Sequence, residues 1–227
     1  MTVTRAQLVA NTLEFMDANN STRWTTPIVQ TMLGIAHARE WSGILGANPY
    51  FRFASRSVTT DANGQVAYTA LNSGTGDTAQ SWGRILAITD GQMVYRQTSF
   101  MQAPLATTTN QAYQQVDRQW FDAGSNIQIL PVGAGVVLTV TINWTPPRVE
   151  SLSSDTVQVD FPDGYEIILA LEAAALLLSK GAMENDAAQT MRAMAQDQRE
   201  TMYSDIGRRS AAPLFLRYPD SASNWAG

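Results

Sequence analysis

Residues 160–178 limit most strongly what this chain can fold into. Residues 160–166 (Asp-Phe-Pro-Asp-Gly-Tyr-Glu) combine proline, aspartate and glycine as tight turns do, and the run that follows, Ile167–Leu178, contains one polar residue, Glu172. A helix that is apolar on every side cannot lie on the surface of a small monomer. The sequence therefore predicts a helix over residues 163–180 that is central in the fold or packed against other subunits.

The composition excludes several kinds of catalytic and metal site. The chain has 227 residues, 44% of them hydrophobic, which is enough for one large domain or two small ones with a proper core. It has no cysteine, so disulfides, thiolate metal sites and thiol nucleophiles are excluded. Its single histidine, His37, excludes a multi-histidine metal site and leaves one candidate for a histidine base. We therefore expect no catalytic residues, no cofactor and no bound metal.

The charge balance argues against a dedicated nucleic-acid binder. The net charge is −5 and the pI is about 4.8, whereas such binders normally have a basic patch. Lys180 is the only lysine among the 15 basic residues; the arginines either suit forked pairing with carboxylates at interfaces or reflect a GC-rich genome. No secretory signal opens the chain, and Ile167–Leu178 is shorter than the roughly 20 residues that span a bilayer. We expect a soluble protein made in a reducing cytosol, with no membrane contact.

Both halves of the N-terminal region have the pattern of helices. The first helix is predicted over residues 4–19, where Thr4 and Gln7 have the spacing of a capping box. The second is predicted to begin at Thr26 as N-cap, before a proline at the first helical position, and to end near Gly46. Two helices joined by a short turn predict a helical hairpin.

The middle of the chain has the pattern of β-strands. From residue 51 the apolar period changes to two, and the turn signals Asn63-Gly64, Asp90-Gly91 and 122–124 divide the region into short segments, the first two typical of hairpins. Residues 136–144, rich in Val, Thr and Ile, form the longest predicted strand. Short strands with frequent turns favour an antiparallel β-sandwich or a small barrel.

The order of these segments predicts an α+β fold: a four-helix bundle with an inserted β domain. Residues 1–50 form the N-terminal helical hairpin, residues 51–160 the β domain, and residues 161–210 a C-terminal helical hairpin, with its second helix over 185–205, that completes the bundle. Residues 211–227 lack a helical period, and their prolines favour an extended arm. The apolar residues of the arm either dock on a partner or fold back over the protein's own core; they are Leu214, Phe215, Leu216, Tyr218 and Trp225.

Two groups of titratable residues invite a catalytic interpretation. His37 lies three residues before Glu40, but no second histidine completes a helical zinc motif, and no Gly-x-Ser-x-Gly segment presents a serine. Asp160, Asp163 and Glu166 could act as paired carboxylates on a glycan. Turn formation and helix-dipole capping explain the same three acids. We favour these structural roles, and a structural or solvated His37.

Three segments carry a resemblance to a known family. The first is a helix followed by Trp24-Thr25-Thr26-Pro27-Ile28 and a second helix; the second is Trp144-Thr145-Pro146-Pro147, which ends the β region. The third is Val159-Asp160-Phe161-Pro162-Asp163-Gly164-Tyr165-Glu166, which leads into the alanine- and leucine-rich helix. In this order they resemble the head-to-tail adaptor proteins of tailed bacteriophages, also called connector or head-completion proteins. The resemblance covers roughly half of the chain and leaves most of the β region unmatched.

The resemblance implies a structural virion protein and no enzyme. Adaptors form a ring, here expected to hold twelve subunits, between the portal protein and a downstream tail or nozzle protein. Double-stranded DNA passes through the ring without specific binding, which an acidic chain favours. The chain is then expected at the head–tail neck of the virion after assembly in the host cytoplasm.

The resemblance also implies roles for two sets of residues. The five apolar residues of the arm are expected to grip the portal, because aromatic anchors commonly dominate interface energies. Part of the apolar helix is expected to pack within the bundle or between subunits, and the residues concerned are Ile167, Ala170, Leu171, Ala174, Leu177 and Leu178. The β region is longer than in many relatives, which leaves its orientation in the ring open.

Two other functions remain open at this point. A tail-side stopper or completion protein belongs to the same class. A carbohydrate-binding β-sandwich module with a helical oligomerisation region belongs to a different one. The second function predicts aromatic side chains exposed on one sheet face, because sugars stack on aromatic rings; the candidates are Trp82, Tyr95, Tyr113 and Trp120.

Overall fold

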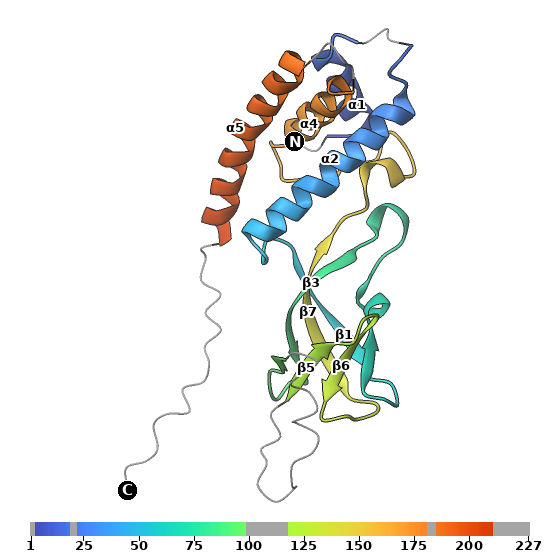
Figure 1. Cartoon of the computed structure of the whole chain (residues 1–227). Helices are drawn as coiled ribbons and strands as arrows, with labels where there is room; N and C mark the ends of the chain where they lie inside the picture. The colour runs from blue at the N-terminus through green and yellow to red at the C-terminus, as the bar shows by residue number, and fades with distance from the viewer. Residues whose placement is uncertain (1–2, 19–21, 99–117, 181–184, 211–227) are drawn as a thin grey trace, which may run out of the picture.

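The computed structural model describes residues 3–18, 22–98, 118–180 and 185–210. Within these residues the chain is α+β, as the sequence predicts, with four α-helices and two β-sheets of three and four strands. Figure 1 shows the helices together at one end of the molecule and the strands at the other. The chain passes from helices to strands and back once.

The first helix begins where the sequence predicts. α1 (Arg5–Phe15) has Thr4 as its N-cap, and the Gln7 backbone N–H donates to the Thr4 hydroxyl at 3.3 Å. The Gln7 side-chain oxygen in turn accepts from the Thr4 backbone N–H at 2.9 Å, which confirms the capping box. Two backbone donors that no helical carbonyl can reach are thereby satisfied.

The two longest helices differ from the prediction at their ends. α2 (Thr26–Ala47) has Thr25 as its N-cap, one residue earlier than predicted, and it runs through Gly46. α5 (Asn185–Ser210) continues past residue 205, where the sequence predicts its end. Glycine lowers helix stability by only about 1 kcal/mol relative to alanine, so packing against neighbouring elements overrides that stop signal in α2.

The apolar helix α4 (Ile167–Leu178) is the centre of the helical region. It contacts α1, α2 and α5, and most of its side chains are buried in one hydrophobic cluster with residues of those helices. Burial of a leucine or isoleucine side chain contributes about 1.5–3 kcal/mol, so α4 supplies a large part of the cluster's stabilisation. The helix is therefore central within a single chain.

The strands form two sheets that share a second hydrophobic cluster. The orders are β1 (Phe53–Thr59), β7 (Val137–Thr145), β3 (Ser81–Thr89) in one sheet and β2 (Gln65–Ala67), β6 (Asn126–Leu130), β5 (Gln119–Asp122), β4 (Arg96–Gln97) in the other. Short 3-10 helices lie at Tyr68–Leu71, Gly76–Thr78 and Val149–Ser151. The cluster holds Val58, Val66, Leu71, Ile88, Tyr95, Trp120, Ile127, Ile129, Leu138, Val140 and Ile142.

The predicted turns form, but one of them does not make a hairpin. β5 and β6 pair across Gly124, whose φ is 85°, so that hairpin is confirmed. At Asp90-Gly91 the chain turns back for a single bridge between Thr89 and Val94. The Asn63-Gly64 turn is present, yet β1 pairs with β7 while β2 pairs with β6. The hairpin predicted there is wrong, because the chain crosses from one sheet to the other at that turn.

The segment after the last strand packs on the helices. The strands end at Thr145, and Val149, Leu152 and Val159 lie in the same hydrophobic cluster as α4. Residues 149–160, which the sequence places in the inserted β domain, therefore contribute to the helical core. Among the described residues, no helix combines the length and the apolar character needed to cross a membrane.

Candidate functional site

The part of the molecule that joins helices to strands concentrates its polar and aromatic contacts. The chain crosses there twice, at residues 48–52 and at residues 146–161, and we call these two segments the junction. Because both crossings are irregular, their backbone groups and their orientation depend on side-chain contacts. Three groups of contacts hold them, and each centres on an arginine or on the single histidine.

Arg52 connects the two crossings. Its guanidinium pairs with Asp160 Oδ1 at 2.6 Å and lies over the ring of Trp144, 5.3 Å from the centroid. It also lies 5.8 Å from the centroid of Trp41 on α2. Burial raises the pKa of Asp160, and the charge of Arg52 acts in the opposite direction. One side chain thus contacts the end of α2, the end of β7 and the turn that leads to α4.

His37 and Trp41 fix the same turn from the side of α2. His37 is 1% exposed, and its Nε2 lies 3.0 Å from the Asp160 carbonyl oxygen. Trp41 Nε1–H donates to that oxygen at 3.2 Å and to His37 Nε2 at 3.0 Å. Phe161 packs against both rings. Burial lowers the pKa of His37 to about 4, so the imidazole is neutral at pH 7.

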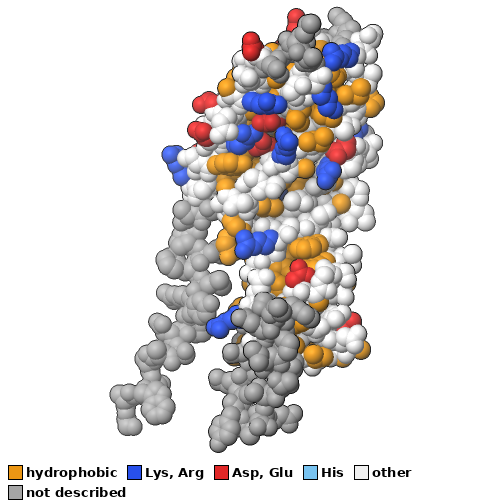
Figure 2. All heavy atoms as spheres, in the orientation of Figure 1, with side chains coloured by type: hydrophobic (Ala, Val, Ile, Leu, Met, Phe, Trp, Pro, Cys, Tyr) orange, Lys and Arg blue, Asp and Glu red, His pale blue; other side chains and the backbone are white. Residues whose placement is uncertain are grey.

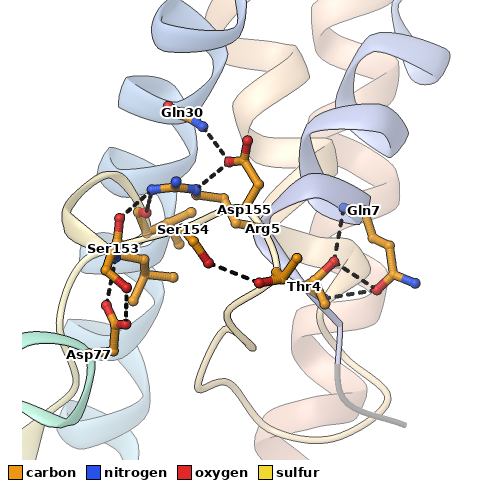
Figure 3. Close-up of polar contacts among 11 residues, drawn as sticks. Thr4, Arg5, Gln7, Gln30, Asp77, Ser153, Ser154 and Asp155 are labelled. Carbon is orange, nitrogen blue, oxygen red and sulfur yellow. Dashed lines mark hydrogen bonds and ion pairs between the residues drawn. The ribbon is translucent and has the colours of Figure 1, made fainter.

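Arg5 holds the second crossing against the helices (Figure 3). Its Nε pairs with Asp155 Oδ1 at 2.8 Å, and its Nη1 donates to the Leu152 carbonyl at 2.7 Å. Gln30 on α2 donates to the same Asp155 oxygen at 3.0 Å. From the strand side, Asp77 accepts from the Ser153 backbone N–H at 2.7 Å and from the Ser153 hydroxyl. The crossing is therefore tied to α1, α2 and the 3-10 helix Gly76–Thr78.

A second buried arginine holds α5 to the other helices. Arg199 pairs with Glu40 on α2 at 2.6 Å and with Glu172 on α4 at 2.5 Å. Arg199 donates hydrogen bonds to both carboxylates, and these bonds, the one to Glu40 first, raise the pKa of Arg199 further above its ordinary value. Glu172, the one polar residue of the apolar helix, is thus used to attach α5.

Two of the three acids before α4, Asp160 and Glu166, serve the structure of the turn, and Asp163 is exposed. Asp160 pairs with Arg52, and Glu166 Oε2 accepts from the Gly164 backbone N–H at 2.8 Å. The described residues contain no group of three or more His, Cys, Asp or Glu side chains that could hold a metal ion. The His37 ring forms its hydrogen bonds with a carbonyl oxygen and an indole N–H. Neither His37 nor the acids before α4 therefore place a base beside a hydroxyl nucleophile. The chemistry that this arrangement supports is attachment of one part of the chain to another.

Five of the six predicted packing residues are buried, and Ala170, Leu171 and Leu177 belong to the helical cluster. Ala170, Leu171, Ala174, Leu177 and Leu178 are buried within a single chain. Ile167, at the first position of α4, is instead 41% exposed. The arm residues Leu214, Phe215, Leu216, Tyr218 and Trp225 lie outside the described residues.

Sequence reasoning missed the residues that hold the junction. The sequence assigns no role to Arg5 or Arg52. It places Arg199 on the side of its helix that faces water, and this is wrong, because Arg199 pairs with two carboxylates that are mostly buried. Arginine in place of lysine is suited to forked pairing with carboxylates. The partners of Arg5, Arg52 and Arg199 lie 150, 108 and 159 residues away along the chain. The excess of arginine was the available signal, and it carries no information about which carboxylate each arginine meets.

The aromatic residues proposed for a sugar site are mostly occupied elsewhere. Tyr95 and Trp120 are buried in the cluster between the sheets. Trp82 stacks on Tyr68 with ring centroids 4.3 Å apart, and Tyr113 lies outside the described residues. Of the candidates within the described residues, two are thus buried and the third stacks on a neighbouring ring. No known protein family and no curated protein matches this chain.

Proposed function

We propose that this chain is a head-to-tail adaptor of a tailed bacteriophage, a structural protein that forms a ring between portal and tail. The observation that carries the proposal is the position of the segments that resemble adaptors. Arg52 is far in sequence from the segments beginning at Trp144 and at Val159, yet it contacts both, pairing with Asp160 and lying over Trp144. The resemblance therefore falls on residues that act together.

This arrangement suits a part that transmits load. An adaptor is attached to the portal on one side and to tail proteins on the other, so its two ends must keep a fixed relative orientation. Arg52 and Arg5 each tie the second crossing to elements on the helical side, and Asp77 ties it to the strand side. These contacts support a stiff connection between a helical body and a β region.

In the proposed assembly the helices form a four-helix bundle and the two sheets a β-sandwich. Twelve subunits close the ring, with exposed Ile167 available for contact with a neighbour. The arm, residues 211–227, grips the portal, and the β region offers a platform for the tail or nozzle protein. The net charge of −5 favours a channel through which DNA passes without binding.

Binding to portal rings tests the proposal. Purified portal of the same phage is mixed with the full chain and separated by sedimentation, and we expect a complex with one chain per portal subunit. A chain that ends at Ser210 lacks the arm and should lose most of this binding. The Asp220→Ser variant, which changes the same arm without removing an apolar residue, should bind as the full chain does.

The outcomes separate the alternatives. Absence of any portal complex would contradict the adaptor proposal. Binding to a tail component but not to the portal would indicate a tail-side stopper or completion protein. Binding to immobilised glycans without binding to either would restore the carbohydrate-binding function, although two of its candidate rings are buried and a third stacks on a neighbouring ring.

A further inference from the structure

A groove lies between the end of α2 and three strands of the β region. It is lined by Pro49 and Tyr50 after α2, by residues 84–87 of β3, and by side chains near β4 and β5. Its volume of about 240 Å³ is below the roughly 300–1,000 Å³ of small-molecule sites. A groove of this size fits one or two protein side chains rather than a cofactor.

The lining of the groove combines polar and apolar groups and is partly open to solvent. Among its apolar side chains, Tyr50 is 51% exposed and Val94 is 64% exposed, and Leu86 and Trp120 also line the groove. Arg84 is the one charged side chain of the lining. Exposed apolar side chains gathered in one hollow mark an interaction site more often than scattered ones do.

The end of α5 lies at the level of this groove. Glu40 of α2 pairs with Arg199 of α5, and Gly43, further along α2, lies beside Tyr203, further along α5. The two helices therefore run in the same direction. Figure 1 shows the last turn of α5 beside the last turn of α2. Ser210, the last residue of α5, is therefore close to the level of Ala47, two residues before the groove begins.

The chain that follows Ser210 matches the groove in reach and pattern. Residues 214–218 (Leu-Phe-Leu-Arg-Tyr) begin four residues after Ser210. Four residues of extended chain span at most about 14 Å. In an extended segment alternate side chains point the same way, so Leu214, Leu216 and Tyr218 share one side while Phe215 and Arg217 share the other. The segment can therefore place apolar groups in the groove and its charge in water.

We infer that the groove holds residues 214–218 of the same chain when no partner is present. The segment follows the end of α5, which lies at the level of the groove, after a short tether. Such a tether gives the segment an effective concentration of about millimolar at the groove. The arm of a second copy of the chain would match this only at a millimolar protein concentration. The inference concerns the free chain and does not depend on the proposed function. If the arm also binds a partner, the groove holds the arm until that partner competes for it.

Protection of a thiol in the groove tests the inference, because the chain has no native cysteine. Val94→Cys places a single thiol on the groove lining, and its rate of reaction with a small aromatic disulfide reagent is measured in the full-length chain. A second full-length chain carries the same thiol with Leu214, Leu216 and Tyr218 replaced by serine. Ser57→Cys, at an exposed position of β1 on the opposite edge of the same sheet, is the matched control.

We expect the V94C thiol to react on the order of tenfold more slowly with the natural arm than with the serine arm, and the S57C thiol to react equally in both. Equal V94C rates with both arms would overturn the inference. So would protection that persists with the serine arm, because another segment would then fill the groove. Protection that disappears on dilution would place the arm of a second copy there and would equally contradict a contact within one chain.

Discussion

The helical region and the β region are held together by different means. In the helical region, arginines at nearly buried positions join distant segments, as Arg199 joins α5 to α2 and α4. In the described β region the one ion pair within the strands and their turns is Arg118–Asp90. Figure 2 likewise shows the charged side chains gathered over the helices, with few over the strands on the face in view.

The difference follows from where each element uses its backbone. A helix satisfies its N–H and C=O groups within itself, so only side chains can specify how helices meet. Strands join through the backbone ladder, as β1 and β7 do over seven residue pairs from Phe53↔Asn143 to Thr59↔Val137. Uncharged side chains are then largely sufficient on the β side, whereas the helical side depends on a few specific charges.

The largest effect is expected where that dependence is strongest. Arg199→Met leaves Glu40 and Glu172 nearly buried without a partner, and we expect the free energy of unfolding to fall by about 3–5 kcal/mol. The control Arg192→Met, at an exposed position of α5, should cost less than about 0.5 kcal/mol. Urea denaturation followed by circular dichroism measures both.

The reason for that loss can be tested separately. If the uncompensated carboxylates cause it, the triple variant Glu40→Gln, Glu172→Gln, Arg199→Met should recover most of the stability, because no charge is then left unpaired. An Arg199→Met variant no less stable than Arg192→Met would show that α5 is held by its apolar contacts alone.

A core substitution in β7 should act on the β region first. Ile142 is fully buried between β1 and β3, and Ile142→Ala should cost about 3 kcal/mol. Hydrogen exchange should rise in the strands while α4 keeps its protection. Thr141→Ala, on the outer face of the same strand, is the control and should change little. Equal loss of protection in α4 would show that the two regions unfold as one unit.

The buried histidine makes stability depend on pH. The pKa of His37 is about 4 in the folded chain and about 6.5 when unfolded, so the unfolded chain binds more protons between these values. The contribution of neutral His37 is complete above pH 6.5 and is lost as the pH falls toward 4, by up to about 3 kcal/mol. His37→Gln should flatten this slope in denaturation measured across the same range. Parallel slopes for the two proteins would contradict the burial of the ring.

The smallest effect on stability is expected at the junction itself. Arg52 and Asp160 are each about one third exposed, so Arg52→Ala should cost about 1 kcal/mol or less. Its local effect should be clearer, with faster hydrogen exchange at residues 146–161 than in the Arg148→Ala control. Unchanged exchange there would mean that Arg52 does not hold the two crossings.

Sequence reasoning succeeded where a feature depends on neighbours in the chain. The capping box at Thr4 and the hairpin at Gly124 are such features, and the central α4 follows from composition alone. It failed at Asn63-Gly64, because turn chemistry does not specify which strand follows in which sheet. Sequence reasoning did not predict the contacts of Arg52 for the same reason, since no local signal selects Asp160 from the other acids.

The central claim is that this chain lies between portal and tail, and cryo-electron microscopy of the native particle that carries it is the most direct test. We predict a collar of this protein directly beneath the portal, with its helices around the channel and residues 211–227 against portal subunits. Density for the chain at a fibre tip or baseplate, or a portal with no such collar beneath it, would contradict the account.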